Sequence, residues 1–285
     1  MFLRVLTSVL LMPLVVALVW WGPAWLVAAV AALIALLALT EFFELGDRLG
    51  LRAFPKWTMI CAALIFYSQY SLGLVETRAV SSGISISRDI AGAVFPLDLA
   101  LLVFIFGCVS IGVWTRRPLQ EVLPAMAMSS AALLFIALPF SYLVRLNEVE
   151  RVGHQLVLFT LCLIWAGDTL AYFVGRSLGR LPMAPALSPK KTWEGALGNL
   201  LASLIVGVFF ARWMQMEALP MLILAALGNM AGQIGDLIES AYKRGAAVKD
   251  SGTLLPGHGG VLDRVDSLTL AAPVVWAAWQ WLGMR

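Results

Sequence analysis

The sequence has little charge, few cysteines and almost no histidine. Asp, Glu, Lys and Arg make up 13% of the 285 residues, and there are three cysteines and two histidines. Because 61% of the residues are hydrophobic and the mean hydropathy is +0.88, an ordinary soluble domain is excluded and a membrane protein is indicated. The net charge of +3, without a soluble basic region, also argues against a nucleic-acid-binding protein.

The cysteines give no sign of a disulfide framework or a zinc site. Cys61, Cys108 and Cys162 each lie inside an apolar run, and their spacing fits no metal-binding motif. We therefore interpret them as small core residues. His154 stands alone at the start of an apolar run, which is typical of a membrane interface.

Apolar runs of about 20 residues, long enough to cross a bilayer as a helix, recur from end to end. We expect about nine such runs, at 5–21, 24–40, 57–75, 97–115, 124–144, 154–175, 195–211, 219–240 and 266–283. The sequence therefore predicts an all-α, polytopic integral membrane protein. A cleaved signal peptide is the alternative for the first run, but hydrophobicity resumes directly after the Gly22-Pro23 turn.

An odd number of spans places the two termini on opposite sides of the membrane. Under this layout most of the 20 Lys and Arg residues fall on the side of the N-terminus. The positive-inside rule then predicts a cytoplasmic N-terminus.

Polar chemistry is concentrated after residue 150. Residues 1–150 contain apolar runs and short connections, so we expect them to form an N-terminal transmembrane scaffold. Residues 151–285 are expected to form the catalytic transmembrane region of the same continuous membrane domain. The longest outward loop, 76–96, shows no pattern that indicates chemistry.

The first polar group in this region is an aspartate within an apolar run. Asp168 precedes Arg176 by about two helical turns, on the order of 12 Å. A carboxylate at such a depth costs about 2.5–3.5 kcal/mol on insertion scales and usually faces the bundle interior or a wet cavity. We favour a site role for Asp168 over a structural ion pair with Arg176.

The second group is the segment Ser188-Pro-Lys-Lys-Thr-Trp-Glu194-Gly195. Ser188 followed by a proline predicts an N-cap, which places Lys190 and Lys191 in the first turn of a helix. Two cations oppose the helix dipole there, whereas exposed N–H groups beside two ammonium groups would suit a phosphate. The alternative is that these lysines only follow the positive-inside rule.

The third group lies at the end of the eighth apolar run. Spacings of three and four place four polar residues on one helical face: Asp236, Glu239, Ser240 and Lys243. Glu239 and Lys243 can form a simple surface pair. Asp236 lies deeper in the apolar run, where an unpaired carboxylate is costly, and therefore indicates a site.

A glycine- and base-rich segment follows and ends on two further carboxylates. Asp263 and Asp266 open the ninth run three residues apart, where they could merely complement a helix dipole. Acidic groups at two adjacent helix ends can also converge on a hard cation, which prefers oxygen ligands. Four nearby bases would neutralise phosphates bound to that cation: Lys243, Arg244, Lys249 and Arg264. The composition favours nucleotide-dependent phosphoryl or nucleotidyl transfer.

The order of these residues resembles a known signature. From Ser240 to Asp266 the chain contains Lys-Arg-x4-Lys-Asp-x-Gly-x2-Leu-Pro-x-His-Gly-Gly-x2-Asp-Arg-x-Asp, which closely resembles the signature of the phosphatidate cytidylyltransferases, also called CDP-diacylglycerol synthases. Tyr242 is a mild departure from it. The segments around Asp168 and Ser188–Gly195 also resemble that family.

The resemblance implies a bacterial inner-membrane enzyme. In such a membrane, the charge distribution predicts an active site that faces the cytoplasm and a C-terminus in the periplasm. Such an enzyme converts CTP and phosphatidate to CDP-diacylglycerol and pyrophosphate by direct attack of the lipid phosphate on the α-phosphorus of CTP. The implied cofactor is Mg²⁺, with room for a second, monovalent cation such as K⁺. A homodimer is left open, and no nucleic-acid partner is expected.

The resemblance also assigns roles to individual residues. Asp236 and Asp263 are the first choice of metal ligands, and with Lys243, Arg244 and His258 they form the expected catalytic set. A simple loop hydrogen bond is the alternative for His258. The residues expected to bind substrate are Asp168, Ser188, Lys190, Lys191, Thr192, Glu194, Lys249, Asp250, Gly259, Gly260, Arg264 and Asp266.

Two other activities remain open at this point. A CTP-dependent polyprenol kinase shares the membrane setting and the nucleotide but would release CDP rather than pyrophosphate. A proton-coupled transporter would account for Asp168, Asp236 and Glu239 within apolar runs, but it leaves the glycine- and base-rich segment unexplained.

Overall fold

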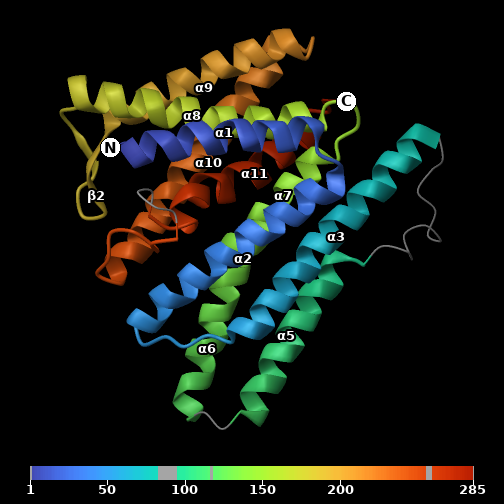
Figure 1. The fold of residues 1–285 in the computed structure, drawn as a ribbon, viewed down its shortest axis with the longest axis vertical. Coiled ribbons are helices and arrows are strands. Elements are labelled where there is room, and N and C mark those ends of the chain that lie inside the picture. The colour runs from blue at the N-terminus through green and yellow to red at the C-terminus, as the bar shows by residue number, and fades with distance from the viewer. Residues whose placement is uncertain (1, 83–94, 116–117, 255–258, 285) are drawn as a thin grey trace. The chain divides into compact units, whose positions relative to one another are not determined.

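The computed structural model describes residues 2–82, 95–115, 118–254 and 259–284, which form helices and one short two-stranded sheet (Figure 1). His258 and most of the 76–96 loop lie outside these residues. The helices are α1 (Phe2–Trp21), α2 (Ala24–Arg48), α3 (Pro55–Ser82), α5 (Leu97–Trp114), α6 (Leu119–Ala132), the π-helical turn η1 (Leu133–Ala137), α7 (Leu138–Asn147), α8 (Gly153–Leu178), α9 (Trp193–Trp213), α10 (Ala218–Gly245) and α11 (Leu262–Trp281).

Each apolar run expected from the sequence lies on a helix, and α6, η1 and α7 together carry the fifth run. Seven helical segments in the described residues are long and apolar enough to cross a membrane: Ala24–Arg48, Pro55–Glu76, Leu97–Trp114, Leu119–Asn147, Gly153–Leu178, Trp193–Trp213 and Ala218–Gly245. The predicted all-α, polytopic membrane protein is therefore confirmed, with two fewer such segments than expected.

The first and last helices are not among these seven segments. Helix α1 spans Phe2–Trp21 and contains the apolar segment Leu10–Trp21. The first two turns of helix α11 contain Asp263, Arg264 and Asp266, and the charges of these residues lower the hydropathy there. The side of the membrane on which each terminus lies stays a prediction.

Prolines and glycines mark where the helices start and stop. Helix α1 ends at Trp21, and Pro23 precedes the first residue of α2, so the predicted break at Gly22-Pro23 is confirmed. Pro55 opens α3, where its missing N–H group costs no hydrogen bond. Gly50 follows α2 with a φ of 74°, a left-handed conformation that glycine adopts without a steric penalty.

The chain forms two compact units. The N-terminal unit contains residues 1–153 together with 250–263, and the C-terminal unit contains residues 154–249 together with 264–285. The 250–263 segment thus packs with the N-terminal helices, although it follows α10 in the sequence. The functional division expected near residue 150 stays a prediction.

The N-terminal unit has an apolar core between its long helices. Helix α3 packs against α2, α5 and α7, and the core includes the fully buried side chains of Leu39, Ile65 and Leu146. Small residues allow close approach, because a Cβ on Gly107 would lie 2.1 Å from the Trp57 ring. Cys61 and Cys108 are buried in this unit, as expected for small core residues.

In the C-terminal unit the Ser188–Gly195 segment does not fold as the sequence predicted. Residues Ser188–Thr192 form a strand, β2, that pairs antiparallel with β1 (Pro182–Ala184), and α9 begins only at Trp193. The prediction of Ser188 as an N-cap is therefore wrong. Thr192 is an equally suitable cap and accepts a hydrogen bond from the Gly195 N–H group at 3.2 Å, while pairing with β1 keeps the preceding residues extended.

Candidate active site

Glycines bring four helices of the C-terminal unit into close contact in two pairs. A Cβ on Gly167 of α8 would lie 2.0 Å from Asn199 Oδ1 on α9, and a Cβ on Gly235 of α10 would lie 2.6 Å from the Asp266 carbonyl oxygen on α11. Helices in membrane proteins often approach one another through such small residues. The result here is that polar side chains on neighbouring helices meet inside the bundle.

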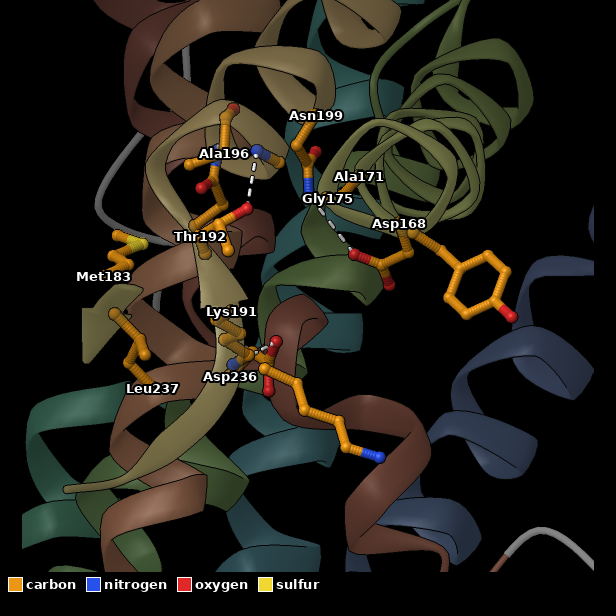
Figure 2. Close-up of a pocket in the computed structure, with 14 residues that line it drawn as sticks. Asp168, Ala171, Gly175, Met183, Lys191, Thr192, Ala196, Asn199, Asp236 and Leu237 are labelled. Atoms are coloured by element: carbon orange, nitrogen blue, oxygen red, sulfur yellow. Dashed lines mark hydrogen bonds and ion pairs between the residues drawn. The ribbon is translucent and has the colours of Figure 1, made fainter. Parts of the chain in front are cut away.

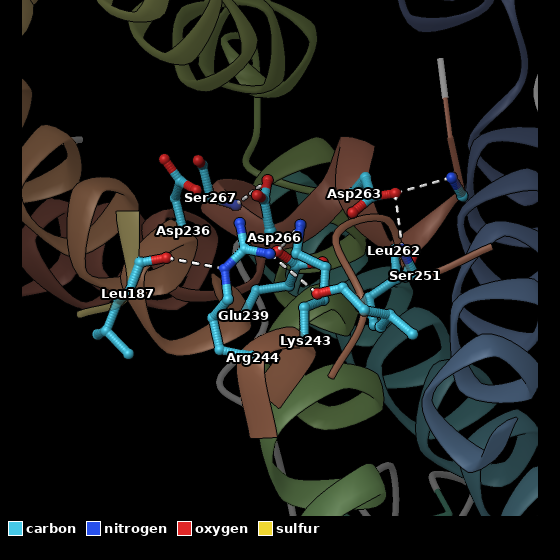
Figure 3. Close-up of polar contacts among 12 residues, drawn as sticks. Leu187, Asp236, Glu239, Lys243, Arg244, Ser251, Leu262, Asp263, Asp266 and Ser267 are labelled. Atoms are coloured by element: carbon cyan, nitrogen blue, oxygen red, sulfur yellow. Dashed lines mark hydrogen bonds and ion pairs between the residues drawn. The ribbon is translucent and has the colours of Figure 1, made fainter. Parts of the chain in front are cut away.

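Three carboxylates from α10 and α11 lie close together and form an acidic cluster, which we define as Asp236, Glu239 and Asp266. One carboxylate oxygen from each residue lies within 4.8 Å of the other two, and Figure 3 shows the three side chains where α10 meets α11. Glu239 is only 3% exposed. Two lysines balance part of this charge, since Lys191 forms an ion pair with Asp236 at 2.5 Å and Lys243 pairs with Glu239.

The acidic cluster has the chemistry of a site for a hard divalent cation. Three carboxylates this close repel one another, and a bound cation would relieve the repulsion that two lysines only partly offset. All of the offered ligands are oxygens, the atoms that Mg²⁺ and Ca²⁺ prefer. The acidic residues therefore fit a divalent ion on charge and on ligand type.

Burial decides one alternative at this cluster. The Glu239 side chain is buried and the Lys243 side chain is partly buried, 4% and 13% exposed, so the two do not form a simple surface pair. Within the C-terminal unit, the carboxylates that lie with Asp236 are those of Glu239 and Asp266. Burial makes the Glu239 charge costly unless it is neutralised, so Glu239 belongs to the candidate site.

Beside the acidic cluster lies a cavity of about 290 Å³. It is lined by Asp168 and Tyr172 of α8, Lys190 and Lys191 of β2, Asn199 of α9, and Gln233 and Asp236 of α10, together with Thr192 and six apolar or glycine residues (Figure 2). Asp236 belongs to both the cavity and the acidic cluster. A ligand in this cavity would therefore have the acidic cluster and its lysines at one end.

A chain of side-chain hydrogen bonds runs from the cavity wall into the bundle. We call it the amide relay and define it as Asp168, Asn199, Asn229 and Gln233. Asn199 Nδ2 donates to Asp168 Oδ1 at 3.3 Å, and Asn229 Nδ2 donates in turn to Asn199 Oδ1. Gln233 Nε2 then donates to Asn229 Oδ1 at 2.7 Å. An ionised carboxylate can only accept hydrogen bonds, so Asp168 fixes which way each amide in the amide relay points.

Asp263 lies in the N-terminal unit and is held by the loop that precedes it. Its Oδ2 accepts hydrogen bonds from the backbone N–H groups of Ser251 at 3.0 Å and Gly260 at 2.8 Å (Figure 3). Gly259 adopts a φ of 83°, and a Cβ there would lie 2.6 Å from the same oxygen. The role of Asp263 as a metal ligand stays a prediction.

A buried glutamate from α2 anchors the same loop. Glu41 is 5% exposed and accepts hydrogen bonds at 2.8 Å from the Ser251 hydroxyl and from the N–H groups of Val261 and Leu262. A Cβ on Gly260 would lie 2.2 Å from the Glu41 carboxylate. The N-terminal helices thus supply a charge that positions the loop carrying Asp263.

Other residues expected at the site lie near the hairpin formed by β1 and β2, or in exposed positions. Arg244 donates through Nε to the Leu187 carbonyl oxygen at 3.1 Å and through Nη1 to that of Val248 at 3.0 Å. Glu194 accepts from the Leu181 N–H group at 3.3 Å. Among the predicted substrate-binding residues that do not line the cavity, Lys249, Asp250 and Arg264 are exposed.

Sequence reasoning missed four polar residues that the structure places at the candidate site or at the loop carrying Asp263: Glu41, Asn199, Asn229 and Gln233. Each lies within a helix long and apolar enough to cross a membrane. That placement is itself a signal, because a polar side chain in such a helix is costly unless it has a partner. The spacing of four between Asn229 and Gln233, which puts them on one helical face with Asp236, is a second signal.

These helices, with an acidic cluster and a lysine-flanked cavity, define a multi-pass membrane protein with a site suited to phosphate-bearing substrates. The sequence profile of the Cytidylyltransferase family matches residues 2–282. The chain belongs to this family.

Bacterial phosphatidate cytidylyltransferases are similar to the chain over different lengths. The Haemophilus influenzae protein is 33% identical over 95% of both chains. The Bacillus subtilis protein is 37% identical over 51% of this chain and 55% of its own length. The Brucella abortus protein is 45% identical over 45% of this chain and 47% of its own length, so these last two matches span about half of each relative.

Proposed function

We propose that the chain transfers the cytidylyl group of CTP to phosphatidate, giving CDP-diacylglycerol and pyrophosphate. This is the activity for which the Haemophilus relative, matched over nearly its whole length, is named. The observation that carries the proposal is the acidic cluster, which Asp236 joins to a cavity flanked by Lys190 and Lys191. Nucleotidyl transfer requires a cation site and bases beside a nucleotide pocket.

The acidic cluster would hold Mg²⁺, with Asp236, Glu239 and Asp266 as ligands. The bound ion supplies charge neutralisation for the triphosphate and for the negative charge that develops on the departing pyrophosphate. Asp263 stays a further candidate ligand from the family resemblance. A second, monovalent ion such as K⁺ is part of the same proposal.

The residues of the chain then bind and orient the two phosphates. Lys190 and Lys191, on β2 at the cavity, would bind phosphate oxygens, with Lys243 beside the acidic cluster and Arg244 at the hairpin. A phosphatidate phosphate oxygen forms a bond to the α-phosphorus of CTP, and the bond to the bridging oxygen of pyrophosphate breaks in line. The attacking oxygen is already ionised at neutral pH, so the step needs no general base and depends on positioning.

The membrane setting suits a substrate with two acyl chains. Phosphatidate could enter between the helices from the bilayer, while CTP arrives from the aqueous side. We propose the bacterial inner membrane as the location, with the active site and the N-terminus facing the cytoplasm. The excess of Lys and Arg on that side supports this orientation.

Product analysis tests the proposed activity directly. The purified protein in mixed micelles would be incubated with phosphatidate, Mg²⁺ and CTP labelled at the α-phosphorus. We expect the label in CDP-diacylglycerol and stoichiometric pyrophosphate, with neither product formed in excess EDTA. Release of CDP from CTP with a polyprenol acceptor would instead favour the kinase, and phosphatidate-independent turnover would contradict the proposal.

A further inference from the structure

The cavity beside the acidic cluster has a size and a lining that suit a small planar ring. Its volume of about 290 Å³ is near the lower end for small-molecule pockets, and its walls include the small side chains of Ala171 and Ala196 and the backbone of Gly175. Small apolar walls allow a flat ring to lie against them. The charged and amide groups of the cavity then decide which ring binds.

Two groups at the polar side of the cavity have hydrogen-bonding capacity to spare. Asp168 uses Oδ1 to accept from Asn199, and its Oδ2 meets no donor among the residues that the structure describes. Asn199 Nδ2 gives one of its two hydrogens to that carboxylate, which leaves the second available. The cavity therefore offers an acceptor next to a donor.

The amide relay makes this pattern fixed rather than adjustable. If Asn199 turned over, its Oδ1 would face the Asp168 carboxylate and its Nδ2 would face Asn229 Nδ2, so two hydrogen bonds would be lost. Asn229 is held in turn by Gln233 and by Ser203 Oγ at 2.6 Å. The donor and the acceptor consequently keep their places.

We infer that this cavity binds the cytosine base of the nucleotide, with Asp168 Oδ2 accepting from the exocyclic amino group and Asn199 Nδ2 donating to ring N3. The inference rests on the proposed function. Cytosine presents a donor beside an acceptor, and carboxylates are known partners of its amino group. Uracil presents the reverse, so its O4 would face the carboxylate and its N3–H group would face the Asn199 donor.

The charges around the cavity argue against a phosphate as its occupant. Asp168 and Asp236 both line it, and either carboxylate would repel a phosphate placed between them. Lys191 pairs with Asp236, so its ammonium group lies at the end of the cavity next to the acidic cluster, where it can contact a phosphate. With the base in the cavity, the phosphates of the nucleotide extend past Asp236 toward the acidic cluster, where cation and lysines neutralise them.

The test compares CTP with UTP in the Asp168→Asn variant. An amide at position 168 can donate to uracil O4, so the ratio of kcat/KM for CTP to that for UTP should fall by about tenfold or more. Glu217→Gln is the matched control, because Glu217 is exposed and precedes the opposite end of α10 from Asp236. A purely structural role for Asp168 would lower both kcat/KM values by the same factor.

If the Asp168→Asn variant has lost turnover, equilibrium binding of nucleotide in the absence of phosphatidate still tests the inference. Competition of UTP against labelled CTP, in Mg²⁺ and detergent, should show the same fall in preference for CTP. A variant that keeps the wild-type preference, or that binds neither nucleotide, overturns the inference. Failure of the proposed function is distinguishable, because wild-type protein would then form no CDP-diacylglycerol from CTP and phosphatidate.

Discussion

At the scale of single residues, carboxylates in this chain do different work according to what surrounds them. Asp236 faces two other carboxylates and a lysine, which favours a cation, whereas Glu41 faces three hydrogen-bond donors and already has a full set of partners. Asp168 stands between these cases, with one oxygen bonded and one open to the cavity. The same carboxylate group is thus an anchor at Glu41, a proposed cation ligand at Asp236 and a proposed recognition group at Asp168.

Asp236→Asn should separate metal binding from folding. Loss of one of three carboxylates weakens the cation site, so we expect cytidylyl transfer to fall by about 100-fold or more and the Mg²⁺ concentration for half-maximal activity to rise. Activity measured against Mg²⁺ concentration, with size-exclusion chromatography to establish folding, checks both effects. An unchanged Mg²⁺ requirement would contradict the assignment of Asp236 as a ligand.

Glu41→Gln should loosen the loop that carries Asp263. The amide nitrogen of glutamine would face a backbone N–H group in place of an acceptor, and hydrogen bonds to a charged group are each worth about 1.5–3 kcal/mol. We expect amide hydrogen exchange at Val261 and Leu262 to become about tenfold faster or more. Glu44→Gln, at an exposed position on the same helix, is the control and should leave exchange unchanged.

At the scale of elements, the glycine positions on α10 set where α11 lies. A Cβ on Gly235 would meet the Asp266 carbonyl oxygen at 2.6 Å, while a Cβ on Gly245 of the same helix would meet nothing within 4 Å. Close approach at Gly235 is what brings Asp266 to Asp236 and Glu239. The acidic cluster therefore depends on the absence of a side chain at one residue.

Gly235→Ala should disturb the acidic cluster through this helix contact. Because backbone rather than a flexible side chain blocks the new methyl group, α11 must shift, and we expect activity to fall by about tenfold or more with a weaker response to Mg²⁺. Gly245→Ala is a control on the same helix and should keep wild-type activity. Equal activity and equal Mg²⁺ response in the two variants would contradict the proposed dependence.

The helices were predictable from the sequence because hydropathy over about 20 residues is a local property. The hairpin was not, since choosing Thr192 over Ser188 as the cap depends on pairing with residues that precede the turn. Asn199 and Glu41 were missed for a related reason. Their partners, Asp168 and the 250–263 loop, are distant in the sequence, so no spacing within one helix reveals them.

At the scale of the whole molecule, the membrane layout depends on the first and last helices. The described residues contain seven long apolar segments, an odd number, so on this count the termini lie on opposite sides if α1 and α11 both cross the membrane or if neither does. If only one of them crosses, the termini lie on the same side. The charges at the start of α11 make its crossing the decisive one.

Reporter fusions at both ends resolve the layout. With the N-terminus cytoplasmic and both end helices crossing, alkaline phosphatase fused after Arg285 should be active, and green fluorescent protein fused there should be dark. A second fusion after Gly260, ahead of α11, should give the opposite pair of results, because one crossing separates the two points. Identical results at the two points would show that α11 does not cross, and would leave Asp266 on a helix lying along the membrane surface rather than one that enters it.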